Sequence, residues 1–145
     1  MFINFQTGQL PLHIDCECVC RCHRRRAPSP QEVLSFIGWT VFQTIDPSNQ
    51  EQLNGFVQYL KEVRNVLLVE AHLGSLIITV SCSSQQILDE LWEDYCSGHL
   101  NEMAQKFLVN DEILKEFDLK EAKLTTTILE EDYRACRQHF LVWSG

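Results

Sequence analysis

The amino-acid sequence predicts an α+β fold in which helices cover one face of an antiparallel sheet. Two apolar runs, "NVLLVEAHL" and "SLIITVSC", meet at a Leu73-Gly74 turn, as in a β-hairpin. Segments before and after this hairpin repeat apolar residues at helical spacing. A further strand pattern follows near the C-terminus. The resulting order of strand, helix, strand, strand, helices, strand and helix begins with the split βαβ pattern of a ferredoxin-like two-layer sandwich with a four-stranded sheet.

The first strand and the first helix of this order are expected between residues 38 and 63. "GWTVFQTID" (38–46) is rich in β-branched and aromatic residues, which favour strands. Ser48 and Glu51 have the spacing of a capping box at the start of a helix over about 49–63. One face of that helix is apolar, with Leu53, Phe56, Val57, Leu60 and Val63.

The hairpin over 65–82 predicts which side chains lie under the helices, because alternate residues of a strand point to opposite faces. The more apolar set is expected against the helices; it comprises Leu67, Val69, Ala71, Leu76, Ile78, Val80 and Cys82. The opposite set comprises Leu68, Glu70, His72, Ile77, Thr79 and Ser81, joined by Lys123, Thr125 and Thr127 of the late strand. This second set is either an ordinary solvated face or a docking surface with an apolar centre at Ile77 and Leu68.

The elements after the hairpin follow from capping and periodicity. Ser83 or Ser84 can cap a helix whose apolar face includes Leu91 and Trp92, and Gly98 ends it. Two shorter helical faces follow, the second starting at Asp111. The segment "KEAKLTTTIL" (120–129) alternates as a strand, and "EEDYRACRQHFLVW" closes the chain as a helix.

The stretch "CECVCRCHRRR" (16–26) has the most unusual composition in the chain. It lies among three of the four prolines, so we expect residues 1–30 to form a disordered Cys/Arg-rich tail and linker, and residues 31–145 to form the domain. One alternative is a metal or redox role, with Cys16, Cys18, Cys20, Cys22 and His23 as weak ligand candidates. The spacing lacks the paired Cys-x₂₋₄-Cys groups of structural zinc sites. Another alternative is membrane attachment, through palmitoylated cysteines beside the arginines.

Composition limits the classes of function. The chain has 145 residues and a formal net charge of −8; residues 1–29 hold four arginines and two acids, and the remainder holds the other eight basic and 18 acidic residues. An acidic domain repels phosphate backbones, so we expect no nucleic-acid partner. No apolar run approaches the length of a membrane span, and the N-terminus has no secretory pattern, so a cytoplasmic protein with reduced thiols is expected.

No catalytic motif emerges from the sequence. It contains no glycine-rich phosphate loop, nucleophile elbow or His-Glu-x-x-His pair, and its five histidines stand apart. The acidic residues of "ELWEDY" are expected to form a solvated helix face. We therefore predict a protein without enzymatic activity and without a cofactor.

The run from 65 to 142 resembles the N-terminal domain family of TRADD, the TNF-receptor-associated death-domain adaptor, and TRADD-like modules of larger immune and death-signalling proteins. The similar features are the strand "GSLIITVSC", the helix centred on Trp92 and Tyr95, the break at Gly98, and the later "KLTTTI" strand with its "EEDYRAC" helix. The resemblance covers about 80 residues well and consists of core positions.

The resemblance implies an αβ sandwich that acts as an adaptor module in apoptotic or innate-immune signalling. It implies a protein partner such as a TRAF-type domain or a death-signalling receptor, docked on the sheet side. Carried over to this chain, Glu70, His72 and Ile77 fall near that surface. Glu70 is acidic where TRADD is not. The resemblance therefore implies use of the same face but not necessarily the same partner. The predicted contact residues are Leu68, Glu70, His72, Ile77, Thr79 and Thr125.

Overall fold

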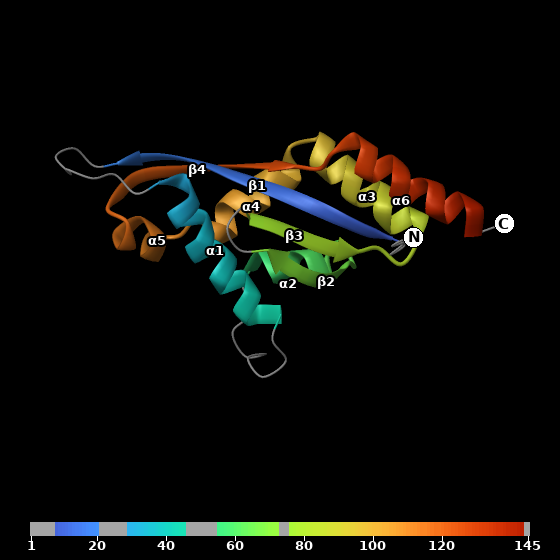
Figure 1. Ribbon diagram of the computed structural model, residues 1–145, viewed down its shortest axis with the longest axis horizontal. Helices are drawn as coiled ribbons and strands as arrows, with labels where there is room; N and C mark the ends of the chain where they lie inside the picture. Colours follow the sequence, from blue (N-terminus) through green and yellow to red (C-terminus); the bar gives the residue numbers. More distant parts are fainter. Residues whose placement is uncertain (1–7, 21–28, 46–54, 73–75, 144–145) are drawn as a thin grey trace.

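The computed structural model describes residues 8–20, 29–45, 55–72 and 76–143 (Figure 1). The strands in these ranges are β1 (Gln9–Cys20), β2 (Leu67–His72), β3 (Leu76–Ser81) and β4 (Leu119–Thr127). The helices are α1 (Pro30–Ile45), α2 (Gly55–Glu62), α3 (Gln85–Cys96), α4 (His99–Leu108), α5 (Asp111–Glu116) and α6 (Glu130–Trp143). The expected turn at Leu73-Gly74 and the capping box of Ser48 and Glu51 lie outside the described residues.

The four strands form one sheet in the order β2-β3-β1-β4, and every neighbouring pair is antiparallel. This is the strand order of a ferredoxin-like sheet, in which β1 lies between β3 and β4. In the view of Figure 1, α2 and α4 lie behind the strands, on one face of the sheet. α1 packs beside β1 and the end of the sheet where β2 finishes and β3 begins. The predicted α+β two-layer sandwich is therefore confirmed.

The expected disordered tail over residues 1–30 is wrong for residues 9–20, which form β1, an interior strand of the sheet. Alternate residues point into the core: Leu10, Leu12 and Ile14 are at most 2% exposed, and Cys16 is 7% exposed. Cysteine behaves here as a small apolar residue that continues the alternation. Pro11 does not interrupt the pairing with β4, because that pairing starts only at His13. The strand signal was therefore present in the sequence, hidden by the composition of its second half.

The expected strand over 38–46 is also wrong, because residues up to Ile45 belong to helix α1. Its start combines two signals: Pro30 occupies the first helical position, and the Ser29 hydroxyl accepts a hydrogen bond of 3.2 Å from the Glu32 amide. The Thr40 hydroxyl donates to the Ile37 carbonyl at 2.7 Å, which satisfies a β-branched residue inside the helix. A buried face at helical spacing then holds the helix in place, comprising Val33, Leu34, Ile37 and Val41.

An irregularity in β2 changes which residues of this strand face the helices. Leu68 lies opposite Val80, whereas Glu70 lies opposite Thr79, so Val69 is an extra residue in the ladder. Leu67 is 65% exposed and Leu68 packs against the core. The predicted placement of Leu67 and Val69 under the helices, and of Leu68 on the other face, is therefore wrong. Beyond the bulge the prediction holds, because Glu70 shares the face of Thr79.

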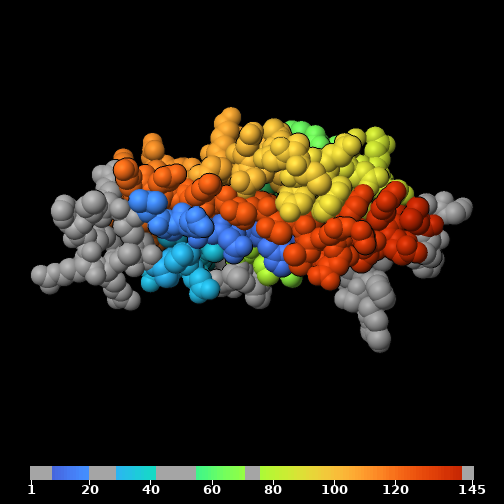
Figure 2. Space-filling view, turned by 90° about the horizontal axis from the view of Figure 1, so that it is seen from above, coloured from blue at the N-terminus to red at the C-terminus, as the bar shows by residue number. Residues whose placement is uncertain are grey.

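The remaining elements agree with the sequence analysis. The Ser84 hydroxyl caps α3 by accepting from the Ile87 amide at 3.2 Å, and Gly98, with φ +87°, separates α3 from α4. Asn110 caps α5 in the same way, through the Ile113 amide at 3.0 Å. Helix α6 packs against α3, and the two lie side by side in the space-filling view (Figure 2).

Candidate functional site

The sheet carries a second face whose side chains point away from the core, and we call it the open face. The register places on it, from β2 to β4, Leu67, Glu70, Ile77, Thr79, Ser81, Gln9, Pro11, His13, Asp15, Glu17, Val19, Glu121, Lys123, Thr125 and Thr127. All of these residues are partly or fully exposed. This contrasts with the alternate residues of the same strands, such as Leu12, Ile78 and Leu124, which are completely buried.

Ile77 lies at the centre of the open face. Its neighbours in the register are His13 on β1 and His72 on β2, and Thr79 follows it along β3. The Nε2 atom of His13 is buried and has no hydrogen-bond partner among the described residues. Only the backbone position of His72 is described. The arrangement is one half-buried apolar side chain surrounded by polar groups, the usual anatomy of a small docking patch.

The rim of the open face is acidic. Asp15, Glu17 and Glu70 are all exposed, and Glu121 adds a further carboxylate. The described part of this face holds a single lysine, Lys123, opposite Glu17 in the β1–β4 register. A partner that docks here would meet a negative field, which favours basic surfaces and speeds their association at low salt.

Of the six predicted contact residues, the structure brings Glu70, Ile77, Thr79 and Thr125 to the open face, and His72 takes its register position there. Leu68 does not belong to the surface, because the bulge turns it toward the core. Sequence reasoning missed the whole contribution of β1, including His13 and Asp15. Alternation in "LPLHIDCEC" was the signal that could have found it.

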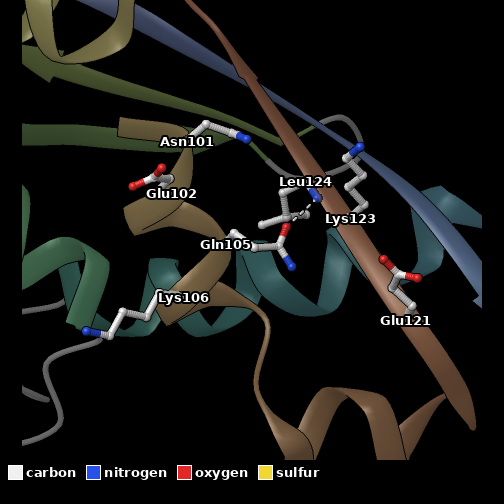
Figure 3. Close-up of a pocket in the computed structure, with 7 residues that line it drawn as sticks. All are labelled: Asn101, Glu102, Gln105, Lys106, Glu121, Lys123 and Leu124. Atoms are coloured by element: carbon white, nitrogen blue, oxygen red, sulfur yellow. Dashed lines mark hydrogen bonds between the residues drawn. The ribbon is translucent and has the colours of Figure 1, made fainter. Parts of the chain in front are cut away.

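The outer edge of β4 borders a groove of about 460 Å³ that separates it from α4 (Figure 3). Gln105 of α4 spans this groove: its Nε2 donates to the Ala122 carbonyl at 2.8 Å, and its Oε1 accepts from the Leu124 amide at 2.7 Å. Asn101 Oδ1 accepts from the Thr126 amide at 2.8 Å. The two amide side chains therefore take the place of a neighbouring strand, which protects this edge from pairing with another chain.

A polar network joins α2, α3 and α4 at a position that sequence reasoning assigned to solvent. Tyr59 donates to Asp94 Oδ2 at 2.6 Å, and His99 Nδ1 lies 2.7 Å from Asp94 Oδ1 and 3.1 Å from the Tyr59 hydroxyl. Asp94 is 8% exposed at its side chain and His99 is 48% exposed. Burial, reinforced by the hydrogen bond to Asp94, raises the pKa of Tyr59. The network satisfies a buried carboxylate between three helices and thereby fixes their packing.

The fold separates the members of the alternating Cys16–His23 segment, which we call the cysteine ladder. Cys16 faces the core, Cys18 is partly exposed on the same side of β1, and the ladder's remaining candidates, Cys22 and His23, lie outside the described residues, as does the side chain of Cys20. Within the described ranges, no three His, Cys, Asp or Glu residues are grouped as metal ligands. No helix among the described residues is long and apolar enough to cross a membrane.

Comparison with known protein families identifies a match over the middle of the chain. Residues 50–113 match the family model of the TRADD-like N-terminal domain. This range contains α2, the β2–β3 hairpin, α3 and α4, and therefore Glu70, Ile77 and Thr79 of the open face. No curated protein and no solved structure matches the chain. The resemblance inferred from the sequence is confirmed over this segment, and residues 50–113 are thus similar to the TRADD-like N-terminal domain, an adaptor-type family of protein-interaction modules.

Proposed function

We propose that this chain is a non-enzymatic adaptor module that docks a partner protein through the open face of its sheet. The observation that carries the proposal is Ile77, an apolar side chain left partly exposed at the centre of the sheet, with polar and acidic residues around it. Burial of such a central residue, enclosed by a polar rim, is how small protein interfaces gain most of their affinity. The similarity of residues 50–113 to an adaptor-type domain supports the same conclusion.

The partner that this proposal favours is a TRAF-type domain or a death-signalling receptor in the cytoplasm, within apoptotic or innate-immune signalling. The support is the family resemblance together with the location of Glu70 and Ile77 on the open face. The acidic rim adds a chemical requirement: the docking surface of the partner has to be basic. An acidic TRAF-type surface would be repelled by Asp15, Glu17 and Glu70.

The test is a binding experiment with purified trimeric TRAF-type domains, comparing the wild type with Ile77→Asp and His72→Asp. Ile77→Asp places a carboxylate at the centre of the patch and is expected to weaken binding at least about tenfold, since central interface residues contribute more than about 1–2 kcal/mol. His72→Asp tests the neighbouring position on β2. The matched control is Lys106→Asp, which introduces the same group on the exposed surface of α4, in the helix layer.

The expected pattern is loss of binding in the open-face variants, retention in the Lys106→Asp control, and weakening of wild-type binding by added salt. Circular dichroism and thermal melting establish that each variant is folded. Wild-type affinity that survives both open-face substitutions would show that another surface is used. A third outcome is that the wild type binds no TRAF-type domain but captures another partner that the open-face variants fail to bind. That result would identify a different class of partner and still support the open face as the docking surface.

A further inference from the structure

Two thiols of the cysteine ladder lie close together in the folded chain. The Sγ atoms of Cys16 and Cys18 are 3.3 Å apart, on the same side of β1. Both cysteines are free. They are held opposite Leu124 and Ala122 of β4, so the distance between them is set by a paired interior strand.

We propose that Cys16 and Cys18 form a reversible oxidation site, in which a hydroperoxide converts the two thiols into a disulfide within strand β1. This site is independent of the open face, because the two thiols point to the opposite side of the sheet from Asp15 and Glu17. It assigns a chemical role to the first half of the ladder that requires neither a metal nor a lipid.

The unequal burial of the two thiols sets the order of the steps. Cys18 is partly exposed and can meet a hydroperoxide, whereas Cys16 is only 7% exposed. Burial, together with the neighbouring Cys18, raises the pKa of the Cys16 thiol to about 12, so it remains protonated at neutral pH and is a poor first nucleophile. Cys18 is therefore the residue oxidised first and Cys16 the residue that resolves the intermediate.

The reaction balances in two steps. The Cys18 thiolate attacks the peroxide, the O–O bond breaks, and the sulfur becomes a sulfenic acid while an alkoxide or hydroxide leaves and takes up a proton. The Cys16 sulfur then attacks the Cys18 sulfur, the S–S bond forms, and the hydroxyl group leaves as water with the proton of the Cys16 thiol. Overall, two electrons pass from the two thiols to one hydroperoxide, and a dithiol reductant reverses the reaction.

Strand geometry makes the disulfide reducible. Residues two apart in a strand have Cα atoms about 6.7 Å apart, which is at the upper end of the range that a disulfide spans, about 4.4–6.8 Å. Closing the bond therefore requires β1 to bend. The β1–β4 register shifts between Val19 and Cys20, immediately after Cys18. The pairing of β1 with β4 is therefore already irregular where this bend would fall. Strained disulfides of this kind are the labile and regulatory ones.

The test uses the full chain, reduced and then treated with hydrogen peroxide, with remaining thiols alkylated before digestion with trypsin. The first basic residue is Arg21, so the N-terminal peptide 1–21 holds Cys16, Cys18 and Cys20, while Cys22 falls in the next peptide. The expected product is peptide 1–21 that has lost two hydrogen atoms and carries one alkyl group. Treatment with dithiothreitol before alkylation should restore three alkyl groups.

Three variants separate the pair from its neighbours. Cys20→Ser should keep the disulfide, Cys18→Ser should abolish it, and Cys16→Ser should leave a sulfenic acid on Cys18 that dimedone traps; Cys16→Ala serves if the serine variant does not fold. The control is Cys96, an exposed lone thiol on α3, which should enter no disulfide in peptide 1–21. The proposal is overturned if the disulfide is lost in Cys20→Ser or retained in Cys18→Ser. It is also overturned if peptide 1–21 loses no hydrogen at a peroxide dose that oxidises Cys96.

Discussion

Replacing Gln105 by alanine tests whether α4 stabilises the outer edge of the sheet. The side chain makes two hydrogen bonds to the β4 backbone, at 2.8 Å and 2.7 Å. Each neutral hydrogen bond contributes about 1 kcal/mol net to the free energy of unfolding. Alanine returns a few tenths of a kcal/mol through helix propensity, and water in the open groove replaces part of the lost bonding.

The expected loss is therefore about 1–2 kcal/mol, which lowers Tm by roughly 3–6 °C for a domain of this size. Urea unfolding followed by tryptophan fluorescence measures it. Gln86→Ala is the matched control, because Gln86 is exposed on α3 and bonds only to Glu90, at 3.3 Å, among the hydrogen bonds of the described residues. Asn101→Ala should fall between the two, with one bond to β4 lost. Equal losses in Gln105→Ala and Gln86→Ala would refute the edge-sealing role.

Two further predictions concern the strands. Leu68→Ala should lower the free energy of unfolding by about 2 kcal/mol because Leu68 packs against the core, whereas Leu67→Ala should change it by less than about 0.5 kcal/mol. Chemical denaturation of both variants measures the two values. The reverse ranking would mean that β2 has no bulge at Val69. Burial raises the pKa of the Cys82 thiol from its ordinary value of 9.0 to about 12, so the folded state keeps a proton that the unfolded chain loses. The contribution of Cys82 to stability should therefore be fully present below pH 9 and be lost as the pH rises toward 12. Measured as Tm against pH, the fall should be shallower in Cys82→Ala than in the wild type. Identical slopes would contradict the raised pKa of Cys82.

The hairpin and the helices after it were predictable because their signals are local. Ser84 caps α3, Gly98 supplies a positive φ between two helices, and Leu76, Ile78 and Val80 alternate cleanly into the core. Each of these depends on a few neighbouring residues. The candidate site was predictable to the same extent: Ile77 and Thr79 follow from the alternation of β3 alone.

The errors arose where local signals pointed two ways. The residues 38–45 favour a strand by composition, yet Pro30 and the Ser29 cap start a helix that runs through them. In β2, simple alternation placed Leu68 on the wrong face because a bulge adds one residue to the strand. Such a bulge depends on the partner strand, and β3 is paired with β2 only in the folded sheet.

The sequence by itself determined the class of fold, the central hairpin with its capped helices, and the similarity of residues 50–113 to an adaptor domain. Only the tertiary structure decided that the alternating segment Gln9–Cys20 is an interior strand, because its place in the sheet depends on hydrogen bonds to β3 on one edge and to β4 on the other. That same pairing creates the open face around Ile77 and holds the Cys16 and Cys18 thiols together. Both features arise from contacts between residues about 60 to 110 positions apart, which local propensity does not encode.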